Sequence, residues 1–203
     1  MKQFPSKRNI VYLQDNHVHK QHTVISTLET ERVFLHQLKE NGVKVPMILD
    51  ICSNTLVTEY ITGQTIPDFL EQSVTATDCN AVAENLICWL KHFYCAVAYT
   101  STHEIRGDIN GRNFIITSDL EIYGVDFENH EYGSIEEDLG RLLAYIDSYY
   151  LEDNSAAVML HSSVLEHAIS TFAVDIDDIM SAKQTELAAM QQRRSDRISR
   201  EEL

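Results

Sequence analysis

Two carboxylates and one amide are spaced so that they could share one site. Asp108 and Asn113 bracket a short loop that contains Gly111, so both side chains can converge on one point. Asp126 follows thirteen residues after Asn113, beyond two apolar runs that are joined by a turn. A strand–turn–strand unit would return Asp126 to the side of the loop. Because Mg²⁺ prefers oxygen ligands and phosphoryl transfer requires charge neutralisation, this spacing favours a magnesium and phosphate site.

The segments around these residues resemble two motifs of protein-kinase-like phosphotransferases. Residues 107–113 are similar to the catalytic loop, and residues 124–128 resemble the metal-binding segment that protein kinases write Asp-Phe-Gly. The similarity is greatest to kinases of the aminoglycoside-phosphotransferase type, which write Asp-Trp/Phe-Glu there. It implies that Asp108 is the catalytic residue, that Asn113 and Asp126 bind Mg²⁺, and that ATP is the nucleotide. By the same resemblance, Asp138 braces the catalytic loop.

The chain before this site is expected to form a small antiparallel β-sheet with one helix. Residues 9–13 and 17–20 read as a hairpin, and residues 45–51 and 55–61 read as two further strands. Residues 26–41 have the apolar spacing of a helix that Gly42 ends.

Two charged residues in this half match the needs of a kinase, which uses a strand lysine held by a helix glutamate. Lys20 lies on the second hairpin strand, and Val18 lies on the same face, where it would contact adenine. Glu31 falls on the core-facing stripe of the helix, where an unpaired carboxylate is costly. We therefore expect Lys20 and Glu31 to pair, and the resemblance implies that they hold the α- and β-phosphates.

Residues 56–63 resemble the hinge between the two lobes of a kinase. The resemblance implies that Thr58 guards the adenine pocket, while Glu59 and Ile61 offer backbone groups to the base. The predicted fold class is therefore α+β, a two-lobed protein-kinase-like fold. Residues 1–61 would form the sheet lobe. Residues 62–203 would form a mainly helical lobe with helices near 67–72, 78–99, 135–150, 155–173 and 176–199, and a hairpin at 113–116 and 122–125.

The sequence departs from the kinase pattern in two places. None of the seven glycines precedes Gly42, so the glycine-rich phosphate loop is missing, and a shortened turn or strand edge would have to cover the nucleotide. The chain also starts too late for a full first strand. Arg106 replaces the usual histidine of the catalytic loop. Arg112 could place positive charge near the γ-phosphate, although a solvated side chain is an equal alternative.

The charge of the 203-residue chain is −15 and uneven. Residues 1–61 hold seven basic and six acidic residues, and the remainder holds nine basic and 25 acidic residues, so a nucleic-acid partner is disfavoured. An acidic set in the second part could bind an amine-bearing acceptor or could be a solvated face: Glu128, Glu131, Glu136, Glu137, Asp147, Glu152 and Asp153. The basic stretch 193–200 resembles a helix end or a docking tail.

The remaining composition favours a cytoplasmic protein that does not enter membranes. No long uncharged apolar run is present, and the start of the chain lacks the apolar region of a signal peptide. The four cysteines form no CxxC pair and read as structural, with Cys88 and Cys95 buried in an apolar helix. His17, His19 and His22 cluster near one strand, but a metal site there is the less favoured interpretation.

These observations predict ATP- and Mg²⁺-dependent transfer of the γ-phosphoryl group to a hydroxyl of a small molecule, for which the acidic set allows a cationic acceptor. Two alternatives stay open. One is a minimal atypical Ser/Thr protein kinase, whose partner would be a protein substrate. The other is a catalytically inactive pseudokinase that acts as a binding module, which the missing glycine loop suggests.

Overall fold

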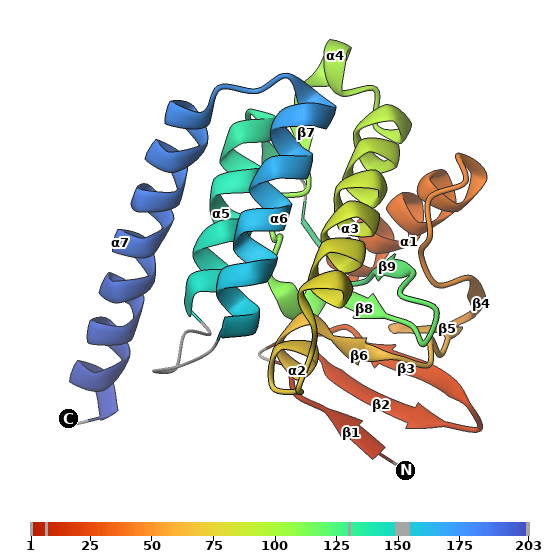
Figure 1. Ribbon diagram of the computed structural model, residues 1–203. Coiled ribbons are helices and arrows are strands. Elements are labelled where there is room, and N and C mark those ends of the chain that lie inside the picture. Colours follow the sequence, from red (N-terminus) through yellow and green to blue (C-terminus); the bar gives the residue numbers. More distant parts are fainter. Residues whose placement is uncertain (1, 7, 130, 149–154, 202–203) are drawn as a thin grey trace.

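The computed structural model describes residues 2–6, 8–129, 131–148 and 155–201, and side chains in the last range as far as residue 196 (Figure 1). The N-terminal part contains a five-stranded antiparallel sheet in the order β1-β2-β3-β5-β4. Its strands are β1 (Lys2–Phe4), β2 (Ile10–Gln14), β3 (His17–Gln21), β4 (Ile48–Cys52) and β5 (Thr55–Glu59). The first strand, expected not to be full, is present as the three-residue β1, which pairs with β2.

The register of this sheet fixes which side chains share a face. The β2–β3 turn is made by Asp15 and Asn16, both with positive φ, a conformation that Asn and Asp tolerate well. Val18 pairs with Thr58 across β3 and β5, and Lys20 pairs with Leu56. Because residues two apart point to the same face of a strand, Val18 and Lys20 lie side by side.

Helix α1 (Ile25–Glu40) packs its expected apolar stripe into the core. Leu28, Leu35 and Leu38 are buried, and the same stripe buries Glu31. The helix ends at Asn41 and Gly42, whose φ of +77° favours glycine.

The second part is mainly helical, as expected. Its helices are α2 (Ile66–Leu70), α3 (Ala76–Ala96), α4 (Tyr99–Thr102), α5 (Ile135–Ser148), α6 (Ser155–Phe172) and α7 (Ile176–Glu201). In Figure 1, α3, α6 and α5 lie side by side and α7 follows outside α5. A Cβ at Gly140 would lie 2.6 Å from Ala182 Cβ, so glycine allows α5 and α7 to approach closely. The N-cap of α3 is Thr75, and Asp78 completes its capping box at the third helical position.

Short strands connect these helices. Strands β6 (Gln64–Thr65), β8 (Phe114–Ile116) and β9 (Ile122–Gly124) form one small antiparallel sheet, and β7 (Glu104–Ile105) pairs with β10 (Glu131–Tyr132). The single-turn 3₁₀ helix η1 (Gly111–Asn113) leads into β8. The sequence predicted β8 and β9 but not the two-residue strands.

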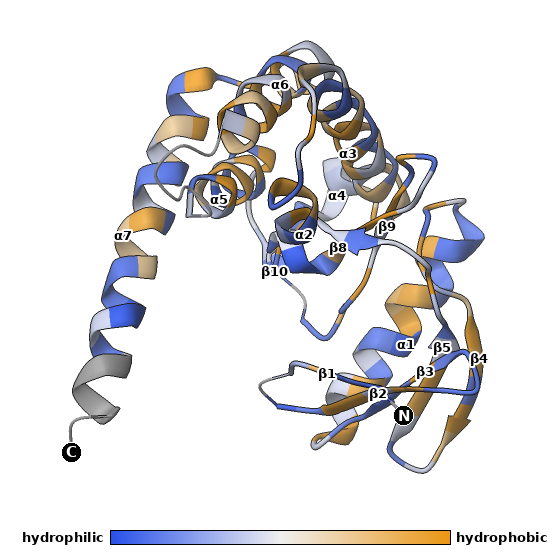
Figure 2. Ribbon diagram, turned by 60° about the horizontal axis from the view of Figure 1, so that its bottom comes forward, coloured by the Kyte–Doolittle hydropathy of each residue, from blue (hydrophilic) through white to orange (hydrophobic). Residues whose placement is uncertain are grey.

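The core runs continuously from α1 into the helices of the second part. Trp89 Nε1 donates to the Lys44 carbonyl at 2.8 Å, and Gln37 Nε2 donates to the Ala96 carbonyl at 3.0 Å. Figure 2 shows the sheet and α1 on one side and the helices on the other. Within the described residues, no helix combines the length and apolar character needed to cross a bilayer.

The cysteine prediction was partly wrong. All four cysteines are free, but only Cys79 is buried, whereas Cys88 and Cys95 lie on the exposed face of α3. A spacing of seven places two residues on one helix face without telling which face meets the core.

Candidate active site

The Lys20 ammonium lies where the two parts of the molecule meet, and three carboxylates surround it. Its Nζ is 2.8 Å from Glu31 Oε2 on α1. It is also 2.6 Å from Asp126 Oδ1 and 2.6 Å from Glu128 Oε1, both in the segment after β9. The predicted pair of Lys20 and Glu31 is therefore present, and Asp126 joins it across 106 residues of sequence.

The electrostatics of this group favour the charged forms. Burial alone would lower the pKa of the Lys20 ammonium, but the charges of Glu31 and Asp126 outweigh it and raise the pKa above its ordinary value. Burial would likewise raise the pKa of Glu31, yet Lys20 and His22 lower it to about 2. Both groups are thus ionised near neutral pH.

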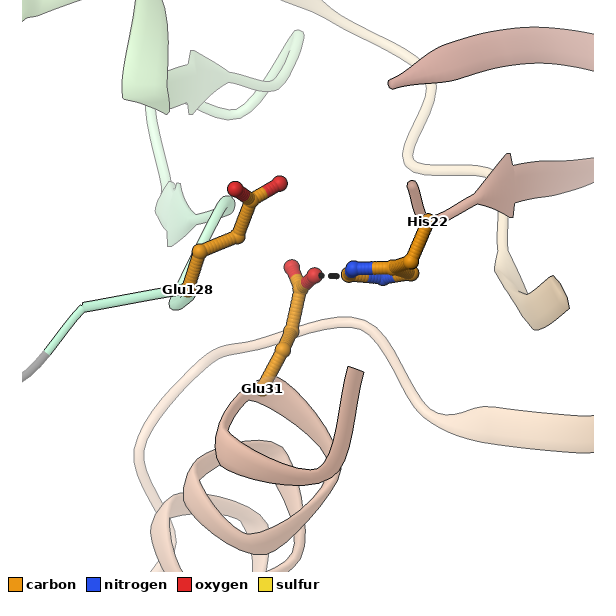
Figure 3. A group of neighbouring side chains, drawn as sticks. All are labelled: His22, Glu31 and Glu128. Atoms are coloured by element: carbon orange, nitrogen blue, oxygen red, sulfur yellow. Dashed lines mark ion pairs between the residues drawn. The ribbon is translucent and has the colours of Figure 1, made fainter. Parts of the chain in front are cut away.

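Glu31 also holds the Asp-Phe-Glu segment directly. Its Oε1 accepts the backbone N–H of Phe127 at 3.2 Å, and its Oε2 lies 3.3 Å from Nε2 of His22. Figure 3 shows Glu31 rising from α1 toward His22 at the end of β3, with Glu128 entering from the other side.

The cluster of His22, Glu31 and Glu128 has the residue types of a metal site, and their ligand atoms lie within 4.8 Å of one another. The Lys20 ammonium, however, lies within 2.8 Å of both carboxylates and already supplies the cation. Of the other two histidines noted near this strand, His17 is exposed and His19 stacks on Tyr12 at 5.0 Å.

Asn113 immediately precedes β8, and Asp126 follows the end of β9 by two residues. The Val125 N–H donates to the Asn113 carbonyl at 2.9 Å, which continues the β8–β9 pairing to the residue before Asp126. Asn113 Nδ2 donates to the Asp108 carbonyl at 3.1 Å, so Oδ1 is its remaining donor atom for a cation. The Asp126 side chain is 42% exposed, and these oxygens fit Mg²⁺.

A buried aspartate supports the loop that carries Asp108. Asp138 on α5 accepts the N–H groups of Arg106 and Gly107 at 2.6 and 2.8 Å, and the Tyr94 hydroxyl at 2.9 Å. Burial raises the pKa of Asp138, and these three donors oppose the shift. Asp108 itself is half-buried at the next position. Asp138 therefore braces the loop as the resemblance implied.

Arg106 ties this loop to the Asp-Phe-Glu segment. Its buried guanidinium donates to the carbonyls of Val125 and Asp126, each at 2.7 Å, and lies 4.4 Å from the centre of the Phe127 ring. Burial lowers the pKa of Arg106, and nearby carboxylates, Asp108 first among them, oppose the shift. The residue that replaces the usual histidine thus links two segments of the site.

Gly107 is required at the start of the loop. Its φ is +68°, and a Cβ there would lie 2.4 Å from the side chain of Glu131. Arg141 links Gly107 to Glu131, because its Nη1 donates to the Gly107 carbonyl at 3.2 Å and to Glu131 Oε2 at 2.5 Å. Arg112 is exposed, which matches the solvated alternative.

The four residues expected around adenine lie on β3, β5 and the chain that follows. Val18 and Thr58 are half-buried partners in adjacent strands, and Ile61 is half-buried after β5. The Glu59 N–H donates to the Met47 carbonyl at 2.9 Å, so the role predicted for Glu59 now depends on its carbonyl.

Two polar residues between β1 and β2 bond to each other, since Ser6 Oγ accepts the Asn9 N–H at 3.2 Å. Asn9 is buried and bonds on both sides: its Oδ1 accepts from Thr23 N–H at 3.1 Å, and its Nδ2 donates to Glu128.

Most of the predicted acidic face is neutralised by internal partners. Glu128 pairs with Lys20, Glu131 and Glu137 pair with Arg141, and Asp147 pairs with Lys183. Glu152 and Asp153 lie outside the described residues. A groove of about 500 Å³ between α5 and α7 keeps an acidic lining that includes Glu136, Glu137, Asp178 and Glu186, with Arg141 in its wall.

Sequence reasoning missed three members of the site. Glu128 was placed on a surface, although its position two residues after Asp126 within the Asp-Phe-Glu motif was a usable signal. Asn9 carried no signal, and His22 was noted only as part of a histidine cluster, because the partners of both residues come from distant parts of the chain.

The comparison with family models decides the family. A model described as the RIO domain matches residues 2–149, which is well over half of the chain. The chain belongs to the RIO domain family. The predicted protein-kinase-like superfamily and two-lobed fold are therefore confirmed.

Solved structures resemble this RIO-domain chain in fold. A high-resolution crystal structure of WbdD has a TM-score of 0.57 at 12% identity and covers 92% of this chain and 50% of that one. A structure titled as the bifunctional kinase-methyltransferase WbdD has a TM-score of 0.55 at 14% identity, covering 88% and 47%. The co-crystal of WbdD with the kinase inhibitor LY294002 gives 0.53 at 14%, covering 89% and 49%. The chain thus spans about half the length of these proteins. Among curated protein sequences, none matches it.

Proposed function

We propose that this RIO-domain chain is a phosphotransferase that moves the γ-phosphoryl group of ATP to a hydroxyl, with Mg²⁺. The observation that carries the proposal is the 2.6 Å contact of Lys20 with Asp126. The Lys20 ammonium from the sheet, which is suited to bind phosphates, thereby meets the half-exposed Asp126 carboxylate, which is suited to bind a metal. Asp126 directly follows Val125, whose N–H bonds to the Asn113 carbonyl.

The nucleotide and its metal would be bound by separate sets of residues. Lys20, held by Glu31, binds the α- and β-phosphates, while Val18, Thr58, Glu59 and Ile61 surround the adenine. Asn113 and Asp126 would hold Mg²⁺, which neutralises phosphate charge when bound.

Asp108 orients the acceptor hydroxyl and takes its proton. The hydroxyl oxygen then forms a bond to the γ-phosphorus, the bond from that phosphorus to the bridging oxygen breaks, and ADP leaves with the electron pair. The hydrogen bonds of Asp138 to the loop keep Asp108 in place during this exchange.

The acceptor is proposed to be a small hydroxyl compound. The acidic groove between α5 and α7 supports a cationic one, because Arg141 in its wall also contacts the Gly107 carbonyl beside Asp108. A Ser or Thr side chain of a protein is the second candidate, which the RIO domain match favours. Incubation with ATP and either small hydroxyl compounds or candidate proteins separates the two, through phosphate found on the compound or on the protein.

Asp108→Ala tests the proposal, with Asp119→Ala, an exposed turn residue, as the matched control. Loss of the base should lower the rate of ADP formation by about 10²- to 10⁴-fold, while the thermal shift caused by ATP with Mg²⁺ persists. Equal rates in wild type and Asp108→Ala would remove Asp108 as the base. If the wild type shows no thermal shift with ATP and consumes no ATP, the result would instead favour a pseudokinase.

A further inference from the structure

His22 is a buried imidazole with two contacts of different kinds. Its side chain is 0% exposed. Nδ1 lies 3.1 Å from Thr27 Oγ1. Nε2 lies 3.3 Å from Glu31 Oε2, the contact that Figure 3 marks with a dashed line. Neither contact was anticipated from the sequence, and the proposed phosphoryl transfer does not by itself use this residue.

The hydrogen bonds around the ring restrict where its protons lie. Thr27 Oγ1 donates its single proton to the Val24 carbonyl at 2.8 Å, so it can only accept from His22 Nδ1. A neutral ring would then present the bare lone pair of Nε2 to a carboxylate oxygen, and a buried Nε2 without a partner is costly. A second proton on Nε2 turns this contact into an ion pair.

The charges that face His22 favour that second proton. Lys20 lies on the same chain segment, Glu31 on α1 and Glu128 after β9, and Asp126 is linked through Lys20. Three carboxylates thus surround a single ammonium. An ammonium has three N–H groups, so Lys20 can bind a phosphate only by releasing one of these carboxylates.

We propose that His22 is an imidazolium and a positioning residue, which holds Glu31 in place while Lys20 turns toward the phosphates. The proposal rests on the proposed binding of ATP by Lys20. Glu31 is too deeply buried to lose its cation without a replacement, and His22 supplies one on its other side. Phe127 N–H remains on Oε1, so the Asp-Phe-Glu segment keeps its place.

A variant without the charge of His22 tests this role through nucleotide binding. His22→Gln keeps a neutral donor near Glu31 but carries no charge, so its dissociation constant for ATP with Mg²⁺ should be roughly tenfold higher than that of the wild type. His17→Gln, at an exposed histidine of the preceding strand β3, is the matched control and should behave as the wild type.

A ring ¹⁵N NMR spectrum of the wild type tests the charge independently of nucleotide binding. Two protonated nitrogens on His22 near neutral pH support the proposal, and a single Nδ1–H with a bare Nε2 overturns it. A His22→Gln variant that binds ATP with Mg²⁺ as tightly as the wild type also overturns it. If the protein binds no ATP at any pH, the proposed function fails, while the spectrum still decides the state of His22.

Discussion

Two groups of side chains in this molecule combine a lysine, a histidine and carboxylates, and they differ in charge balance. Between α5, α6 and α7, the single carboxylate of Asp147 lies 2.5 Å from Lys183 Nζ and 2.6 Å from His161 Nδ1. Burial would raise the pKa of Asp147, but these two partners lower it. Each oxygen therefore has its own partner, and the group joins three helices.

At the Lys20 site the ratio is reversed, because three carboxylates share one ammonium. A group with excess negative charge beside the half-exposed Asp126 attracts further cations, whereas the Asp147 group is already satisfied. The difference indicates that the Asp147 group serves to join helices and that the Lys20 group is arranged to exchange partners.

The largest expected difference concerns the two lysines. Lys20→Met should lower ATP-dependent turnover by at least about 100-fold, because it removes the donor proposed for the phosphates. Lys183→Met should leave turnover unchanged, since Lys183 contacts only the helical group. ADP formation by folded protein measures both variants, and similar losses would contradict the separation of the two groups.

The fall in the free energy of unfolding at acid pH, the acid limb of the stability profile, should depend on Glu31. Its pKa is lowered from an ordinary 4.5 to about 2, so its contribution is complete above about pH 4.5 and is lost as the pH falls toward 2. The lost free energy of unfolding is on the order of 3 kcal/mol. Urea unfolding at several pH values should show a flatter acid limb for Glu31→Gln.

Glu29→Gln, on the exposed side of the same helix, is the control for this measurement. It should keep the steep wild-type acid limb. Identical limbs for Glu31→Gln and Glu29→Gln would show that Glu31 is not held by its cations.

The smallest expected effects are on the free energy of unfolding, which should fall in one variant and stay the same or rise in the other. Asp147→Asn leaves Lys183 and His161 without their anion and should destabilise the protein by about 2 kcal/mol. Glu128→Gln removes one surplus charge and keeps an acceptor for Asn9, so stability should stay the same or rise by up to about 1 kcal/mol. Urea unfolding near neutral pH measures both, and destabilisation of equal size would contradict the comparison.

The sequence predicted those parts whose signals are local. Periodicity placed α1 and its stripe, so Glu31 could be directed inward, and motif order brought Lys20 and Asp126 into one hypothesis. Strands of two residues, such as β7 and β10, have too little periodicity to be recognised. They matter all the same, because β10 carries Glu131 toward Gly107 and Arg141.

The direction of individual side chains was harder to predict. Glu128 turns to Lys20 because Asn9, 119 positions away in the chain, holds it there. His22 reaches Glu31 only because the chain enters α1 at an angle that no local pattern specifies. Such contacts depend on how the elements dock, which composition and spacing do not contain.

The most direct test of the account is a crystal structure with a non-hydrolysable ATP analogue and Mg²⁺. We expect triphosphate density between Lys20 and Asp126, a metal contacted by Asn113 and Asp126, and the Lys20 ammonium shifted from a carboxylate to a phosphate. A nucleotide bound elsewhere on the protein, with the Lys20 contacts unchanged, would contradict it.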